Sequence, residues 1–248
     1  MMRIACASLL LVLGVSAAPA MAGDIAYEAA GQKLTGYFAE AKDPKGLVLI
    51  LHDWDGISDH ERARADRLAK MGYDSFALDL FGADIPVETL EDRIAAVEKL
   101  QKDRRLMQGL ISAGVAQANA LTRAEEMVVI GYCFGGGAAL AMARSEFAEQ
   151  ARGYAIFHGN LATPEGEEWS STPPPILIMH GGADEAVPVV EGIALMQELE
   201  ALDADYTFEI YSGAPHGFTV SGSDAYQPRA DEQSWHTLTD FLAERLGE

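Results

Sequence analysis

A cysteine lies where an apolar segment gives way to a helix-forming one. Residues 131–136 read GYCFGG and follow an apolar run that ends at Ile130. A strand–turn–helix of this kind holds a nucleophile on a tight turn, where side chains two residues away on either side would collide with the strand and the helix. The helix N-terminus favours a thiolate and an oxyanion beside it. The pattern predicts that Cys133 is a catalytic nucleophile; the alternative is an inert, buried cysteine beside a glycine-rich turn.

Two further polar residues follow later apolar runs. Asp184 comes shortly after the run that ends at Met179, and His216 after the run that ends at Tyr211. Each alone is weak, because an aspartate in a turn commonly caps the backbone. Together they give the chain order nucleophile, acid, histidine, in which His216 is the general base and Asp184 orients its imidazole. This predicts acyl transfer to the Cys133 sulfur.

Acyl transfer also requires hydrogen-bond donors for the oxyanion of the tetrahedral intermediate. The residue after the nucleophile supplies one such donor in turns of this kind, so we expect the backbone N–H of Phe134 to do so. The second donor is expected from the loop after the apolar run Leu47–Leu51, at the backbone N–H of Trp54.

Apolar runs alternate with helix-forming segments along the chain, and these elements must position the three side chains. The alternation predicts one α/β domain with a mostly parallel central sheet and helices on both faces, plus an antiparallel edge hairpin within Ile25–Phe38. In such sheets the ligand binds beyond the carboxyl ends of the strands. The predicted strands are Leu47–Leu51, Tyr73–Leu78, Met127–Ile130, Gly153–Phe157, Ile176–Met179 and Tyr206–Tyr211. The predicted helices are Ser58–Met71, two within Val87–Ala120 broken near Gly109, Phe134–Arg144, Val189–Leu202 and Arg229–Leu246.

The N-terminus has the pattern of a secretion signal. Arg3 precedes the apolar segment Leu9–Val15, and Ala20-Met21-Ala22 supplies a small-residue cleavage site. We expect a signal peptide at residues 1–22, a domain at residues 23–248 and a periplasmic or secreted location. An uncleaved anchor is the alternative, but a membrane span needs about 20 apolar residues. Cleavage would leave Cys133 as the single cysteine, without an intramolecular disulfide.

Composition excludes some classes of partner. The 248 residues carry a formal net charge of −20, with the acids scattered along the chain. Nucleic-acid binding needs clustered lysine and arginine, so no nucleic-acid partner is expected, and anionic membranes should attract the chain little. We expect a small-molecule substrate, while the oligomeric state stays open.

The chain resembles the dienelactone hydrolase family over almost all its length after the signal. The resemblance implies a compact α/β-hydrolase fold without a large lid, and hydrolysis of enol-lactones and esters without metal or cofactor. It rests on His52-Asp53-Trp54-Asp55-Gly56, Leu68-Ala69 with Gly72-Tyr73, Asp79-Leu80-Phe81-Gly82, the GYCFGG segment, His180-Gly181 with Asp184, and His216-Gly217-Phe218.

Two departures from the family pattern bear on activation and substrate. In the family a glutamate after the first buried strand contacts the resting cysteine; here the matching residue is Asp53, one methylene shorter. A substrate-binding arginine four residues after the catalytic histidine is replaced by Val220, which favours a neutral ester over an anionic lactone. Val220 and the aromatic residues Phe81 and Phe218 are expected to line the substrate pocket.

Three other functions are compatible with parts of the sequence. A neutral phosphotriester would suit the same cysteine and the missing arginine. A metallohydrolase could use His52, Asp53, Asp55 and His60, although their spacing matches no common zinc motif and would leave the cysteine turn unexplained. A non-catalytic ligand-binding protein is the third alternative. Loss of activity with a chelator and its recovery with zinc would favour the metallohydrolase. Equal rates in wild type and Cys133→Ala with an activated aryl ester would refute the cysteine mechanism.

Overall fold

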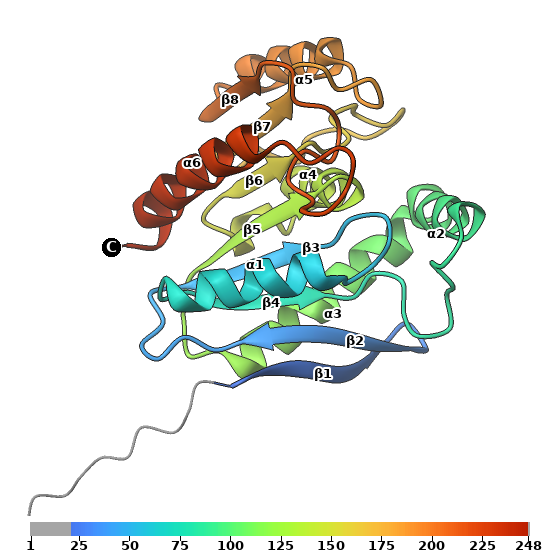
Figure 1. Ribbon diagram of the computed structural model, residues 1–248, viewed down its shortest axis with the longest axis vertical. Coiled ribbons are helices and arrows are strands. Elements are labelled where there is room, and N and C mark those ends of the chain that lie inside the picture. The colour runs from blue at the N-terminus through green and yellow to red at the C-terminus, as the bar shows by residue number, and fades with distance from the viewer. Residues whose placement is uncertain (1–20, 248) are drawn as a thin grey trace, which may run out of the picture.

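The computed structural model describes residues 21–247, which form one domain built on an eight-stranded sheet (Figure 1). The predicted signal segment therefore lies outside the described residues, except for Met21 and Ala22. The strand order is β1-β2-β4-β3-β5-β6-β7-β8. The strands are β1 Ala22–Ala29, β2 Gln32–Ala39, β3 Leu47–Leu51, β4 Asp74–Leu78, β5 Met127–Tyr132, β6 Tyr154–Phe157, β7 Ile176–Gly181 and β8 Tyr206–Tyr211.

The sheet is parallel from β4 to β8, and its antiparallel part is the hairpin β1–β2 at one edge. This confirms the predicted fold class and the predicted edge hairpin. Because β3, β5, β7 and β8 run in the same direction, the loops that follow them meet at one edge of the sheet.

Helices cover both faces of the sheet. Along β3, Leu47, Leu49 and Leu51 contribute to the hydrophobic core on one face, while Val48 and Ile50 contribute to the core on the other. Helices α2, α3, α4 and α5 pack on the first face, and α1 and α6 on the second (Figure 1). The helices are α1 Asp59–Lys70, α2 Leu90–Lys102, α3 Arg104–Leu121, α4 Phe134–Arg144, the short 3₁₀ helix η1 Ala148–Gln150, α5 Val189–Ala201 and α6 Pro228–Leu246.

Helix α1 begins as the sequence predicts. Ser58 is its N-cap and accepts a hydrogen bond from the backbone N–H of His60 at 3.1 Å. The Glu61 carboxylate accepts a hydrogen bond from the Ser58 backbone N–H at 2.9 Å, which completes a capping box. This arrangement fixes the end of the loop that connects β3 to α1.

The break in the long helical segment was predicted near Gly109, and that prediction is wrong. Helix α2 ends and α3 begins at Asp103, whose side chain accepts the backbone N–H of Leu106 at 2.9 Å. Aspartate is a strong N-cap, whereas a glycine inside a helix costs only about 1 kcal/mol and need not end it. Gly109 accordingly lies within α3.

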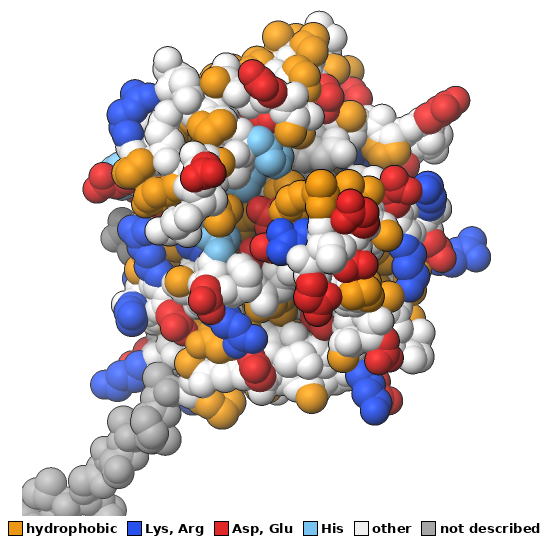
Figure 2. All heavy atoms as spheres, turned by 45° about the vertical axis from the view of Figure 1, so that its right-hand side comes forward, with side chains coloured by type: hydrophobic (Ala, Val, Ile, Leu, Met, Phe, Trp, Pro, Cys, Tyr) orange, Lys and Arg blue, Asp and Glu red, His pale blue; other side chains and the backbone are white. Residues whose placement is uncertain are grey.

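Among residues 21–247, no helix is both long enough and apolar enough to cross a membrane. Acidic and basic side chains are interspersed on the face of the molecule seen in Figure 2, without one large basic patch. That distribution agrees with the scattered charge in the sequence.

Candidate active site

Three side chains from three loops form one hydrogen-bonded chain. The Cys133 Sγ lies 3.0 Å from Nε2 of His216, and Nδ1 of His216 lies 2.9 Å from Oδ2 of Asp184. Cys133 follows β5, Asp184 follows β7 and His216 follows β8, so the three come together only because these strands are parallel. The structure thus brings together the three residues that the sequence singled out.

The backbone at Cys133 is in a region that L-residues rarely adopt, with φ 48° and ψ −112°. The neighbouring glycines allow this turn. A Cβ at Gly131 would lie 2.2 Å from the carbonyl oxygen of Gly135, and a Cβ at Gly135 would lie 2.2 Å from that of Leu51. Neither position can hold a side chain without moving backbone, so the glycines of the GYCFGG segment are required by the turn.

Asp184 is completely buried and held from two sides. Its Oδ1 accepts the backbone N–H groups of Ala186 at 3.0 Å and Val187 at 2.8 Å, which leaves Oδ2 for His216. Burial alone would raise the pKa of Asp184, but the hydrogen bonds from His216 and Val187 outweigh burial and lower it. The carboxylate is therefore ionised and fixes the imidazole with Nδ1 as donor.

His158 lies beside the imidazole of His216. Its ring centroid is 5.3 Å from that of His216, in an edge-to-face arrangement, and its Nε2 is 2.8 Å from the Thr219 hydroxyl. Burial lowers the pKa of His158 well below its ordinary value. His158 is therefore neutral, and it packs against His216 without adding a competing positive charge.

Asp53 lies close to the cysteine despite its short side chain. Asp53 and Cys133 line the same cavity, close enough for each to shift the pKa of the other, and Asp53 Oδ1 accepts the backbone N–H of Trp54 at 2.6 Å. Burial raises the pKa of Asp53 to about 6, and the nearby charges of Asp55 and Glu61 add to this effect. The Asp53 backbone N–H is fixed by the Glu61 carboxylate at 3.3 Å.

The Cys133 thiol is protonated in this arrangement. Burial raises the pKa of Cys133 well above its ordinary value, and the charge of Asp53 and its hydrogen bond raise it further. The backbone N–H of Phe134 opposes this by donating towards the sulfur. A resting thiol, rather than a thiolate, therefore lies between Asp53 and His216.

The two backbone N–H groups predicted to bind an oxyanion are both at the site. That of Phe134 points at the Cys133 sulfur, and that of Trp54 is bonded to Asp53. The Trp54 donor becomes free for a ligand only when the Asp53 carboxylate releases it.

Cys133 and His216 open into a cavity of about 570 Å³. A hollow where histidine, acidic and basic side chains meet is visible near the centre of the face shown in Figure 2. Three carboxylates line the cavity, those of Asp53, Asp55 and Glu61, against a single guanidinium. The volume lies in the range of about 300–1,000 Å³ that is usual for small-molecule sites. The remaining lining residues are Trp54, Ser58, His60, Ala186, Gly217, Val220, Ser223 and Ala225.

Of the three residues predicted to line the pocket, only Val220 does so. Phe81 and Phe218 were predicted wrongly. Phe81 is 5% exposed and stacks on Phe134 at a centroid distance of 5.5 Å, and Phe218 is fully buried in the core beneath α6. Both rings follow strand ends, but they turn into the hydrophobic core because that placement removes more apolar area from water.

Among the residues considered as metal ligands, His52 and Asp53 have other hydrogen-bond partners, whereas the buried Nε2 of His60 has none. His52 is buried, with Nδ1 2.6 Å from the carbonyl oxygen of Asp53 and Nε2 accepting the backbone N–H of Leu80 at 3.0 Å. Within residues 21–247 no three histidine, cysteine or acidic side chains are grouped as a metal site would require. His52 instead ties the loop after β3 to the loop after β4.

Arg93 is a charged cavity residue that the sequence did not indicate. It lies on α2, its guanidinium is 5.5 Å from the centre of the Trp54 ring, and its Nε donates to the carbonyl oxygen of Val87 at 2.7 Å. No local motif marks it, since it lies on an ordinary amphipathic helix. Its position depends on how α2 packs beside the loop after β3.

Comparison with known proteins agrees with this geometry. The family model described as "Dienelactone hydrolase family" matches residues 34–246. A "Putative carboxymethylenebutenolidase" of Saccharolobus solfataricus is 25% identical over 90% of this chain and 98% of its own length. A "Probable 2-oxo-3-(5-oxofuran-2-ylidene)propanoate lactonase" of Bradyrhizobium sp. is 26% identical over 79% of this chain and 82% of its own length.

The fold has a close counterpart among solved structures. A dienelactone hydrolase-like promiscuous phosphotriesterase from metagenomic libraries superposes with a TM-score of 0.81 and 24% identity, covering 91% of this chain and 98% of the other. Its likeness establishes the fold, and the family model spans nearly the whole described domain. This chain is therefore a member of the dienelactone hydrolase family, a hydrolase with the α/β-hydrolase fold.

Proposed function

We propose that this protein hydrolyses neutral carboxylic esters or lactones through a Cys133 nucleophile, with His216 as base and Asp184 as its orienting acid. The observation that carries the proposal is the hydrogen-bonded chain from Sγ of Cys133 through His216 to Asp184, with distances of 3.0 and 2.9 Å. These are the contacts that proton transfer between nucleophile and base requires.

The first half of the reaction forms a thioester. The Cys133 proton passes to Nε2 of His216 as the sulfur attacks the acyl carbon, and the carbonyl oxygen becomes an oxyanion. The backbone N–H groups of Phe134 and Trp54 stabilise this oxyanion, the latter after Asp53 has turned away. The C–O bond to the leaving group then breaks, and the leaving oxygen takes the proton from His216.

The second half releases the acid. Water attacks the thioester carbon while His216 accepts its proton, and the tetrahedral intermediate collapses with loss of the Cys133 sulfur. The sulfur recovers its proton from His216, so the free thiol and a carboxylic acid product result. Asp184 stays ionised throughout and stabilises the imidazolium each time it forms.

The charge of the cavity supports a neutral substrate. Asp53, Asp55 and Glu61 outnumber Arg93, and Val220 occupies the position where the family pattern has an arginine. A substrate carboxylate would meet more negative than positive charge here, which costs binding free energy. Trp54 and Val220 offer apolar surface for an aryl or alkyl group.

The test is a pre-steady-state assay with 4-nitrophenyl acetate on wild type and Cys133→Ala. Wild type should release a burst of nitrophenol of one equivalent per active site and form an acetylated peptide that contains residue 133, found by mass spectrometry. Cys133→Ala should show neither. Equal rates in both proteins would refute the proposal and favour a metal-dependent or non-catalytic role, which chelator treatment and ligand-binding measurements would separate.

A neutral phosphotriester is a second candidate substrate for the same nucleophile. The excess of carboxylates in the cavity favours any substrate without negative charge, and this class meets that condition. Attack by Cys133 on phosphorus would expel an alkoxide or phenoxide and leave a phosphorylated thiol for water to hydrolyse. Side-by-side turnover of an aryl ester, an anionic enol-lactone and an aryl dialkyl phosphate would rank the three classes.

We also propose that the protein is exported, with a signal peptide removed after Ala22. Ala22 is exposed and is the first residue of β1, at the edge of the sheet, so cleavage there would remove one residue of that eight-residue strand. N-terminal sequencing of the protein from a periplasmic or culture fraction should read Gly23. An intact N-terminus in the cytoplasmic fraction would contradict this.

A further inference from the structure

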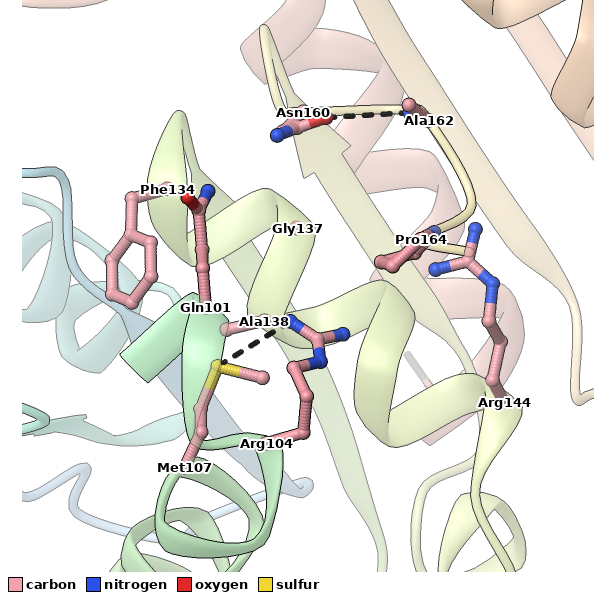
Figure 3. A pocket seen from close by; sticks show the side chains of 10 residues that line it. All are labelled: Gln101, Arg104, Met107, Phe134, Gly137, Ala138, Arg144, Asn160, Ala162 and Pro164. Carbon is pink, nitrogen blue, oxygen red and sulfur yellow. Dashed lines mark hydrogen bonds between the residues drawn. The ribbon is translucent and has the colours of Figure 1, made fainter. Parts of the chain in front are cut away.

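A second cavity, of about 270 Å³, lies between α2, α3, α4 and the segment that follows β6 (Figure 3). It shares no lining residue with the cavity at Cys133. The two are nevertheless adjacent through the backbone, because Phe134 lines the second cavity and Cys133 lines the first. The second cavity is not used by the reaction proposed above.

The polar groups that line this cavity are all hydrogen-bond donors or amides. Two guanidinium groups, those of Arg104 and Arg144, extend towards it from α3 and α4, and the carboxamides of Gln101 and Asn160 border it (Figure 3). No carboxylate belongs to its lining. This is the reverse of the cavity at Cys133, where carboxylates outnumber cations.

Arg144 is held in place, but not all of its N–H groups have hydrogen-bond partners. It is 4% exposed, its guanidinium packs 4.9 Å from the centre of the Trp169 ring, and one terminal nitrogen donates to the Thr163 hydroxyl at 2.8 Å. Its buried Nε has no hydrogen-bond partner. Leaving such a donor unpaired costs free energy, which an anionic ligand in the cavity would recover.

Arg104 is the second cation of the cavity. Its Nε pairs with the Glu167 carboxylate, and one terminal nitrogen lies 4.0 Å from the Met107 sulfur, a poor acceptor. Burial lowers the pKa of Arg144, the nearby carboxylates of Glu198 and Glu167 raise it, and the smaller effect of the Arg104 charge lowers it.

The rest of the lining is apolar. Its apolar lining residues are Met107, Phe134, Ala138, Ala162 and Pro164. The volume is slightly below the usual range of about 300–1,000 Å³ for ligand sites, so the ligand is small. Arginine side chains bind carboxylates in two-point contacts, while a ring or short alkyl chain suits the apolar wall.

We propose that this cavity is a non-catalytic binding site for a small organic carboxylate, whose anionic end pairs with Arg104 and Arg144 and whose apolar body packs against Phe134 and Met107. The site is independent of the nucleophile assignment, because none of its side chains takes part in the triad.

Isothermal titration with benzoate tests the proposal, with benzamide as the neutral analogue and inorganic phosphate as the anion without an apolar body. Wild type should bind one benzoate. Benzamide should bind about tenfold more weakly because it loses a charge-assisted contact, and phosphate about tenfold more weakly because it loses the apolar packing. Phosphate binding as tight as that of benzoate, or no benzoate binding at millimolar concentration, would overturn the proposal.

Matched variants locate the site. Arg104→Gln and Gln101→Glu should each weaken benzoate binding about tenfold, whereas Arg105→Gln, with the same change in net charge at an exposed position outside the lining, should not. Gln101 is exposed, so its variant tests the cavity without disturbing the core. Equal binding by all three variants would reject the site.

Alkylation of Cys133 with iodoacetamide separates this site from the catalytic cavity. The dissociation constant of benzoate for the alkylated protein should lie within about twofold of that for the unmodified protein. This is a smaller change than the loss of one charge-assisted contact would cause. Loss of binding on alkylation would show that benzoate occupies the cavity at Cys133, and the proposal would fall.

Discussion

The carboxylate of Asp53 accepts a hydrogen bond from the backbone N–H of Trp54 at 2.6 Å. This N–H is one of the two donors expected to bind the oxyanion, so Asp53 keeps it from a ligand. The charge of the same carboxylate raises the pKa of Cys133 and so favours the protonated thiol. One side chain therefore acts on both the proposed nucleophile and a proposed oxyanion donor. Its departure would release both.

Asp53→Asn should make Cys133 more reactive at neutral pH. Because the charge of Asp53 raises the pKa of Cys133, removing it lowers that pKa, and the thiolate forms at lower pH. The rate of alkylation by iodoacetamide, measured across a pH series, should have its midpoint at lower pH than in wild type. Asp43→Asn, at an exposed position, is the control and should leave the midpoint unchanged. A midpoint at the wild-type pH or higher in Asp53→Asn would contradict the assignment.

Asp53 should also make stability depend on pH. Its folded pKa of about 6 lies above the ordinary value of 3.8, so the folded state binds the proton more tightly than the unfolded state. The free energy of unfolding should therefore fall as the pH rises from about 4 to about 6. Asp53→Asn has no carboxyl group to ionise at this position. Its free energy of unfolding, measured by urea denaturation, should therefore rise relative to that of wild type by on the order of 2 kcal/mol over that interval. A constant difference between the two proteins would refute the raised pKa.

Asp184→Asn and His216→Ala should each lower kcat/KM for an aryl ester by on the order of 10⁴-fold, because both disrupt the proton transfer from Cys133. Thermal denaturation should show that both variants remain folded. His236→Ala, an exposed histidine on α6, is the matched control and should retain wild-type kinetics. Activity within tenfold of wild type in the His216 variant would mean that another base acts.

Gly131→Ala should destabilise the fold by several kcal/mol. The new Cβ would lie 2.2 Å from the carbonyl oxygen of Gly135, a backbone atom that cannot move independently of α4. Gly109→Ala provides a control of opposite sign, because open space surrounds that position in α3 and alanine favours helix by about 1 kcal/mol. Urea denaturation measures both. A stable Gly131→Ala protein would show that the turn at Cys133 is looser than described.

Val220→Arg should shift substrate preference towards anions. Val220 lines the cavity at Cys133, so an arginine there would offset part of the charge of Asp53, Asp55 and Glu61. The ratio of kcat/KM for an anionic enol-lactone to that for a neutral aryl ester should rise about tenfold relative to wild type. Val220→Gln introduces a polar side chain without a charge and should leave the ratio near the wild-type value. An unchanged ratio in Val220→Arg would show that the charge of the cavity does not determine substrate preference.

Much of the site could be predicted from the sequence because its residues follow strand ends. The order of apolar runs gives a parallel sheet, and a parallel sheet brings Cys133, Asp184 and His216 to one edge. The local pattern around Cys133 even requires its glycines. Where two local signals competed, prediction failed: Asp103 rather than Gly109 separates α2 from α3, since a side-chain cap outweighs the small cost of glycine in a helix.

The sequence by itself determined the fold, the family resemblance and the three residues of the hydrogen-bonded chain, since these depend on periodicity and on short motifs at strand ends. Only the tertiary structure decided which side chains reach the cavities. It turned Phe81 and Phe218 into the core, brought Arg93 to the cavity from a distant helix and placed Asp53 against Cys133. It also paired Arg104 and Arg144 around a second cavity. Such contacts join segments far apart in the chain, so they depend on packing between elements rather than on any local pattern.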